Sequence, residues 1–136
     1  MGFIILLDRA TRRIQRVVKR KPSSDMRALL SIDRVADAVD SSRVRHYEIE
    51  IEAKGTDFSS VTRLTQDLRK SIGPALVPYP HSKLAIGLAL RELAQRGKLP
   101  RYLGPSGYLL PAGWDAVDRI LVDEGVTSAP LGAHSR

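Results

Sequence analysis

The sequence contains no cysteine, so disulfide bonds and thiolate metal ligands are excluded, and any bound metal must be held by oxygen or imidazole. Long apolar runs are also missing. The apolar run near the start, Phe3 to Leu7, is closed by Asp8 and is shorter than the core of a signal peptide. No stretch approaches the ~20 apolar residues that cross a bilayer. We therefore expect a cytoplasmic protein with no membrane partner.

Positive charge is concentrated in the first third of the chain. The 136 residues fit one domain and carry a formal net charge of +7. Residues 1–46 hold 11 Lys and Arg against 5 Asp and Glu, whereas residues 47–136 hold 11 against 10. This asymmetry predicts an anionic partner, either a polyphosphate, a nucleotide or a nucleic acid, and charge alone does not choose among them.

Apolar patterning predicts β-structure in the first third of the chain. We expect strands at Phe3 to Leu7 and Ile14 to Val18, joined by an Arg-rich connection from Asp8 to Arg13. Met26 to Val35 is expected to be a further strand. Its two faces would carry Met26, Ala28, Leu30 and Ile32 on one side, and Arg27, Ser31 and Asp33 on the other.

The segment from Arg43 to Lys54 alternates most strictly and is the clearest predicted strand. One face would carry Tyr47, Ile49, Ile51 and Ala53, and the opposite face His46, Glu48, Glu50, Glu52 and Lys54. Carboxylates two residues apart on a strand face lie roughly 6.5–7 Å apart at the Cα level and repel each other. Either this face is solvated, or it lines a concave sheet where the acids bind Mg²⁺ or Mn²⁺ and nearby cations hold phosphates.

Three helices are predicted in the remainder. The first would be capped by Thr56 or Asp57, run to about Ser71 and end at Gly73. The second would be capped by Ser82, and its apolar composition predicts that it is buried. Turn residues at 104–107 precede a third helix marked by Trp114, Val117, Ile120 and Leu121.

Two runs of sequence and the elements around them resemble a known family. These are Leu29-Leu30-Ser31-Ile32-Asp33-Arg34-Val35 and Arg45-His46-Tyr47-Glu48-Ile49-Glu50-Ile51-Glu52-Ala53-Lys54-Gly55, followed by an amphipathic helix and Ser82-Lys83-Leu84-Ala85-Ile86-Gly87-Leu88. Over residues 26–88 this order resembles the C-terminal half of a CYTH domain, in the triphosphate tunnel metalloenzyme superfamily. That superfamily includes class IV adenylate cyclases, thiamine triphosphatases and inorganic triphosphatases.

The resemblance implies a fold, a ligand and a set of site residues. In the family, an eight-stranded antiparallel barrel forms a tunnel in which acids bind a divalent metal and cations grip a triphosphate. By position, it implies Glu48, Glu50, Glu52 and Asp33 as ligands of Mg²⁺ or Mn²⁺, and Arg27, Lys54 and Lys83 as phosphate contacts. The implied partner is a triphosphate-containing small molecule, and the implied activity is that of a metal-dependent triphosphatase or a cyclase-like enzyme.

One departure from the family pattern limits the predicted fold. Nothing before Met26 supplies the Glu-x-Glu-x-Lys strand with which the family opens, and four predicted strands cannot close an eight-stranded tunnel. We therefore expect an α+β fold in which an antiparallel sheet forms a partial, open CYTH-like barrel with packed helices at 1–96. A hairpin and helix would follow at 97–124, and a flexible tail at 125–136. A truncated product is the preferred explanation, ahead of a half-barrel completed as a homodimer or a domain that binds without catalysis.

Two other function classes remain open. Leu84 to Leu110 could form part of a winged helix that binds DNA, drawing on the basic cluster between Arg9 and Lys21. Nucleic acid is the less favoured partner, because the second helix offers few exposed polar side chains that could contact bases. The acidic strand would also have no role in binding DNA. A protein-interaction module without catalysis would account for the missing strands.

Overall fold

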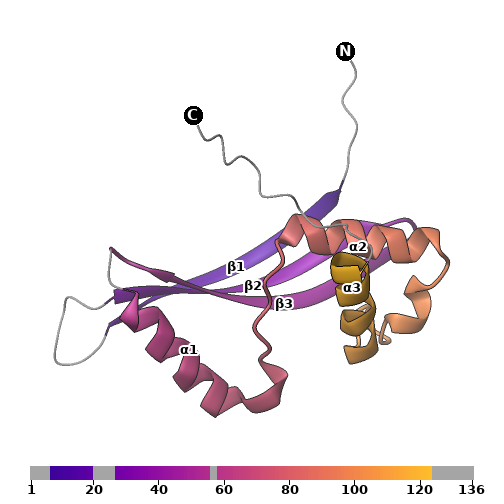
Figure 1. The fold of residues 1–136 in the computed structure, drawn as a ribbon. Helices are drawn as coiled ribbons and strands as arrows, with labels where there is room; N and C mark the ends of the chain where they lie inside the picture. Colours follow the sequence, from indigo (N-terminus) through magenta and orange to yellow (C-terminus); the bar gives the residue numbers. More distant parts are fainter. Residues whose placement is uncertain (1–6, 20–26, 56–57, 124–136) are drawn as a thin grey trace, which may run out of the picture. The chain divides into compact units, whose positions relative to one another are not determined.

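The computed structural model describes residues 7–19, 27–55 and 58–123, and shows an α+β chain (Figure 1). Within these residues, three antiparallel strands form an open sheet in the order β1-β2-β3, accompanied by three α-helices. The bounds are β1 Asp8–Lys19, β2 Arg27–Val39, β3 Ser42–Ala53, α1 Ser59–Ile72, α2 Lys83–Gln95 and α3 Pro111–Asp123, with short 3₁₀ helices η1 Gly73–Ala75 and η2 Leu99–Tyr102. The predicted α+β class with an antiparallel sheet is confirmed.

A two-residue turn joins β2 to β3 and sets their register. Asp40 has a φ of 50°, the left-handed conformation that tight hairpin turns require and that Asp tolerates. Because only Asp40 and Ser41 separate the strands, Val39 lies opposite Ser42. The same register places Asp33 opposite Glu48, and Arg34 opposite Tyr47 on the other face of the sheet.

The prediction for the first strands is confirmed for Ile14 to Val18, which lie in a strand, and is wrong for the segment before them. Asp8 to Arg13 is not a connection, since β1 is one continuous strand of 12 residues from Asp8 to Lys19. Its inward side chains pair in one register with β2: Arg9 with Asp37, Arg13 with Asp33 and Gln15 with Ser31. The Arg-rich sequence forms a strand because carboxylates on the neighbouring strand compensate its charge. Residues 3–6 of the predicted first strand lie outside the described part of the chain.

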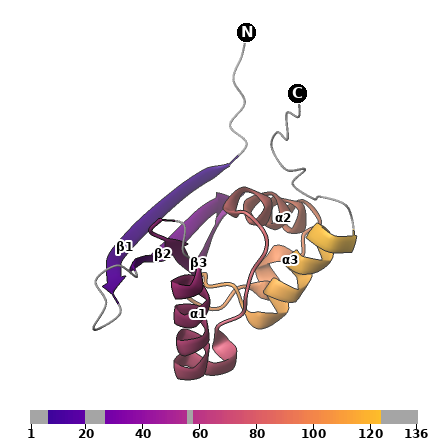
Figure 2. The ribbon, with the colours of Figure 1, turned by 60° about the vertical axis from the view of Figure 1, so that its left-hand side comes forward.

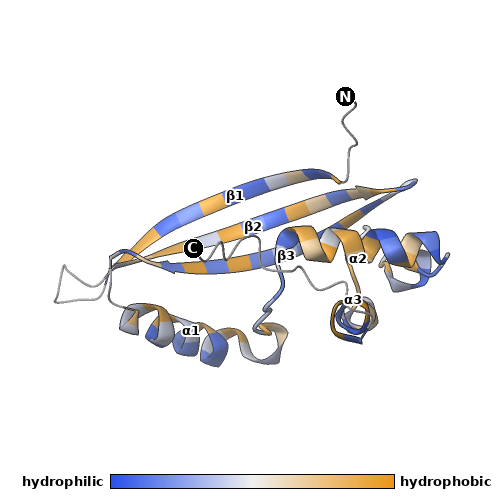
Figure 3. Cartoon of the chain, turned by 45° about the horizontal axis from the view of Figure 1, so that its top comes forward, coloured by the Kyte–Doolittle hydropathy of each residue, from blue (hydrophilic) through white to orange (hydrophobic). Residues whose placement is uncertain are grey.

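The two faces predicted for β2 agree with the alternation of burial along the strand. Ser31, Asp33, Val35, Asp37 and Val39 are buried on one face, whereas Ile32 on the other face is 39% exposed. Apolar residues occur on both faces of this strand, so hydropathy alone did not fix which face is inside. Figure 3 shows the mixture of blue and orange segments along the strands. Pairing of the two aspartates with arginine makes their burial tolerable.

The chain divides into two compact units, and all three strands run through both. The first unit consists of Met1–Ala10, Ala36–His46 and Pro80–Arg136, and the second of Thr11–Val35 and Tyr47–Tyr79. In the first unit, α2 and α3 contact each other (Figure 2). Their packed face includes Ile86, Leu90, Leu93, Val117, Ile120 and Leu121. The hydroxyl of Ser82 accepts a hydrogen bond from the Ala85 N–H, so the predicted cap and the predicted burial of this helix are confirmed.

The second unit contains α1, which has no fully buried residue. It ends at Gly73, whose φ of 75° and whose N–H bond to the Arg69 carbonyl confirm the predicted stop. The residue before its first turn is Phe58, which makes no side-chain cap bond; the predicted caps Thr56 and Asp57 lie outside the described residues. Among the helices of residues 7–19, 27–55 and 58–123, none has the length and apolarity needed to cross a membrane.

A short segment covers part of the free edge of β3. The Arg45 N–H donates to the Gly107 carbonyl at 2.8 Å, and the Leu109 N–H donates to the Arg45 carbonyl at 3.0 Å. Gly107 has a φ of 79°, and a Cβ atom there would lie 2.6 Å from the Arg43 carbonyl oxygen. Only glycine permits this approach between two backbones.

We predict that Gly107→Ala destabilises the chain more than Gly97→Ala. Gly97 also has a positive φ, of 66°, but a Cβ atom there would meet nothing within 4 Å. Gly97→Ala should therefore cost about 1–2 kcal/mol for backbone strain alone, and Gly107→Ala about 1–3 kcal/mol more for the added clash. Urea denaturation of both variants measures the difference. Equal losses would show that the close approach does not matter.

Candidate metal centre

Three carboxylates meet on one face of the sheet in the second unit. One oxygen atom from each of Asp33, Glu48 and Glu50 lies within 4.8 Å of the others. The hairpin register explains this, since Glu48 lies opposite Asp33 and Glu50 is the next residue on the same face of β3. Asp33 is fully buried, and the two glutamates are half-buried. The predicted meeting of the polar faces of these two strands is therefore confirmed.

These three side chains could hold a divalent cation. Carboxylate oxygens are the ligands that Mg²⁺ and Mn²⁺ prefer, and three of them within reach of one point make a plausible donor set. Partial exposure of Glu48 and Glu50 leaves room for water or a phosphate oxygen in the remaining coordination positions. The acidic cluster, defined as Asp33, Glu48 and Glu50, is thus chemically suited to the predicted Mg²⁺ or Mn²⁺.

Arg13 on β1 already supplies one positive charge to the acidic cluster. Its Nε donates to Asp33 Oδ1 at 2.7 Å, and its Nη2 donates to Asp33 Oδ2 at 2.6 Å. The same Nη2 donates to Glu50 Oε2 at 2.7 Å. This fork geometry matches the planar guanidinium to a carboxylate, which makes the contact both strong and directional.

The environment of Arg13 keeps it charged. The side-chain hydrogen bond that Arg13 donates to Asp33 is the largest cause that raises the pKa of Arg13 above its usual value, and the charges of Asp33 and Glu50 add to it. Arg13 therefore remains a cation throughout the pH range in which proteins are studied. The guanidinium thus contributes a fixed positive charge beside the carboxylates of the cluster.

The other predicted site residues are Glu52, Lys54, Lys83 and Arg27. Glu52 and Lys54 are exposed near the end of β3, and Glu52 is not one of the three clustered acids. Lys83 belongs to the first unit, where its backbone carbonyl accepts a hydrogen bond from Arg9 Nη2 at 2.6 Å. The side chain of Arg27 lies outside the described part of the chain.

Sequence reasoning missed the two arginines that pair with buried aspartates. Arg9 binds Asp37 through Nε at 2.6 Å and through Nη2 at 3.0 Å, much as Arg13 binds Asp33. The sequence contained a usable signal: Arg9 and Arg13 lie four positions apart, so they share a face of any strand that contains both. The charge-rich segment was instead interpreted as a connection, which removed that signal.

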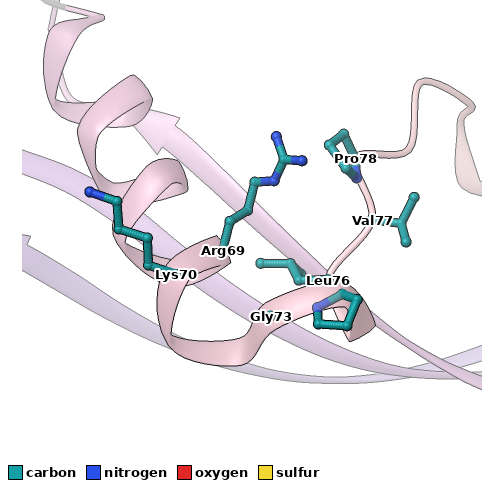
Figure 4. Close-up of a pocket in the computed structure, with 7 residues that line it drawn as sticks. Arg69, Lys70, Gly73, Leu76, Val77 and Pro78 are labelled. Carbon is teal, nitrogen blue, oxygen red and sulfur yellow. The ribbon is translucent and has the colours of Figure 1, made fainter.

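A separate groove lies at the end of α1 (Figure 4). It is lined by Arg69, Lys70, Gly73, Pro74, Leu76, Val77 and Pro78 and has a volume of about 420 Å³. Figure 4 shows Arg69 extended on the side of Pro78, with Lys70 pointing away. The lining contains no carboxylate, so this groove is not suited to hold a cation.

The chain matches no family model, no curated protein and no solved structure. The chemistry of the acidic cluster must therefore be inferred from its own residues.

We predict that Arg13 and Asp33 stabilise the fold as a coupled pair. Arg13→Met leaves the buried Asp33 carboxylate without the hydrogen bonds from the guanidinium, so it should lower the melting temperature by several degrees. Asp33→Asn should lower it by a similar amount. The double variant should lose much less than the sum of the two, because each replacement removes the same interaction. Arg16→Met is the matched control, since its side chain is exposed on the other face of the same strand. Additive losses would contradict the coupling.

Proposed function

We propose that the chain binds Mg²⁺ or Mn²⁺ at Asp33, Glu48 and Glu50 together with a triphosphate-containing small molecule. The observation that carries this proposal is the convergence of three carboxylates and one arginine on a single sheet face. Three acids alone would suit a metal, and a guanidinium beside them suits the phosphate groups that such a metal bridges.

The contacts of Arg13 suggest how both ligands are accommodated. Its bond to Asp33 is buried at the carboxylate end, whereas its bond to Glu50 joins side chains that are 38% and 34% exposed. When Glu50 turns to a metal, Nη2 of Arg13 becomes available to a phosphate oxygen while the fork to Asp33 is retained. Arg13 is therefore the phosphate contact that we propose beside the metal.

The resemblance of residues 26–88 to a CYTH domain supplies the finer proposal. The open sheet would be part of a CYTH-like barrel, and the chain would be related to triphosphate-processing metalloenzymes. Bound metal would polarise the phosphoryl oxygens and stabilise charge that develops during attack by water on the terminal phosphoryl group. The role of the chain's own residues is to hold that metal and, through Arg13, to neutralise and orient the phosphates.

We predict that Mn²⁺-dependent binding of tripolyphosphate requires the acidic cluster. Replacing Glu48 and Glu50 together by Gln removes two ligand charges and should weaken binding by at least about tenfold. Glu52→Gln should change the affinity by less than about threefold, because that carboxylate lies outside the cluster. Isothermal titration calorimetry with Mn²⁺ and tripolyphosphate measures both, and phosphate release with Mg²⁺ reports hydrolysis.

The matched control is Asp67→Asn, which removes an exposed carboxylate from α1 in the same unit. Its affinity should equal that of the original chain. Binding that persists without metal, or that is unchanged in the double Gln variant, would refute the proposed function.

A further inference from the structure

The face of the sheet opposite the acidic cluster carries arginine and apolar side chains in place of carboxylates. Alternation along each strand sends Arg13, Asp33 and Glu48 to one side, and their neighbours Arg12, Arg34 and Tyr47 to the other. We name this second side the arginine face. In the second unit, its exposed members are Arg12, Ile14 and Arg16 on β1, Ile32 and Arg34 on β2, and Tyr47 on β3. The same side also carries apolar residues that are buried or half-buried: Val18, Ala28, Leu30, Ile49, Ile51 and Ala53.

Two arginines on this face lie directly opposite each other. The pairs Arg13 with Asp33 and Gln15 with Ser31 fix the register, which places Arg12 opposite Arg34 and Ile14 opposite Ile32. Like charges at directly opposite positions destabilise a sheet. Among the strand residues of the second unit that point to this side, none is a carboxylate. The repulsion between Arg12 and Arg34 opposes folding, and an anionic ligand would relieve it.

The arginine face also offers exposed apolar and aromatic surface beside these charges. Tyr47 is 59% exposed and lies opposite Arg34, and Ile14 is 51% exposed. An anion that suits this face must therefore carry several negative charges along a line and also present flat, partly apolar groups. Single-stranded nucleic acid has both, since its phosphates bind arginine and its unpaired bases stack on exposed aromatic rings.

We propose that the arginine face binds single-stranded nucleic acid, with Arg12, Arg16 and Arg34 on the phosphates and Tyr47 stacked on a base. Ile14 and Ile32 provide apolar surface for the neighbouring ribose or base. This function is separate from the proposed metal site, because the two sets of side chains point to opposite sides of the same strands. It needs no divalent cation.

The test is fluorescence anisotropy of the full chain with a labelled 20-nucleotide oligo(dT) and a labelled oligo(rU), in EDTA, over 50–300 mM KCl. Affinity should fall with salt, and the slope of log K against log salt should become shallower by about 0.7 in Arg12→Gln and again in Arg34→Gln. Tyr47→Ala should weaken binding by about 5- to 100-fold, as expected for loss of one stacked base.

Two controls make the test specific. Arg63→Gln removes an equally exposed cation from α1 in the same unit, and Glu48→Gln with Glu50→Gln alters only the acidic cluster; both should retain the affinity. Arg12→Gln should also raise the melting temperature, because it relieves the repulsion with Arg34, so loss of binding is not confused with loss of folding.

Three results would overturn the inference. The first is an equal loss of affinity in Arg63→Gln and Arg12→Gln, which would indicate nonspecific attraction to net charge. The second is an unchanged affinity in Tyr47→Ala. The third is equally tight binding of heparin or of phosphatidylserine vesicles with no dependence on Tyr47, which would show that the face recognises charge without bases.

Discussion

The pairing of buried aspartates on β2 with arginines on β1 is the interaction on which the rest of the structure depends. Asp33 and Asp37 are fully buried, and an unpaired carboxylate in such a position costs several kcal/mol. The paired hydrogen bonds from Arg13 and Arg9 offset that cost, and they form in one alignment of the two strands. The ion pairs therefore specify which residues of β1 face inward. The apolar residues of β1 and β2 could not specify this, because they occur on both faces.

This register determines the chemistry of both faces. A slip of one residue would turn Arg12 toward Asp33 and send Arg13 to the opposite side, because side chains alternate along a strand. In the observed alignment, the inner face of the second unit collects the acids and the cation that compensates them. The outer face is left with arginines, isoleucines and a tyrosine. One sheet thus presents two surfaces suited to different anionic or cationic ligands.

The parts of the fold that could be predicted from sequence are those in which local pattern and tertiary packing agree. Strict alternation in β3 gave its bounds to within one residue and placed Glu48 and Glu50 on the same face. Ser82 and Gly73 marked helix ends because they act on their own helix. The strand β1 could not be recognised in the same way, since its inward residues are arginines whose partners lie 20 to 28 positions away along the chain. Which face of β2 is buried could not be predicted for a related reason: ion pairs decide it, and hydropathy does not report them.

The same ion pairs explain why the acidic cluster is poised to accept a further cation. Arg13 binds both oxygens of Asp33 and one oxygen of Glu50, and Glu48 lies beside them. Carboxylates this close disfavour one another's ionised forms, so an added positive charge among them lowers the free energy of the folded state. Both glutamates are half-buried, so an ion can reach their oxygens from solvent. Binding of that ion should therefore stabilise the sheet as well as create the site, because both depend on the same three carboxylates.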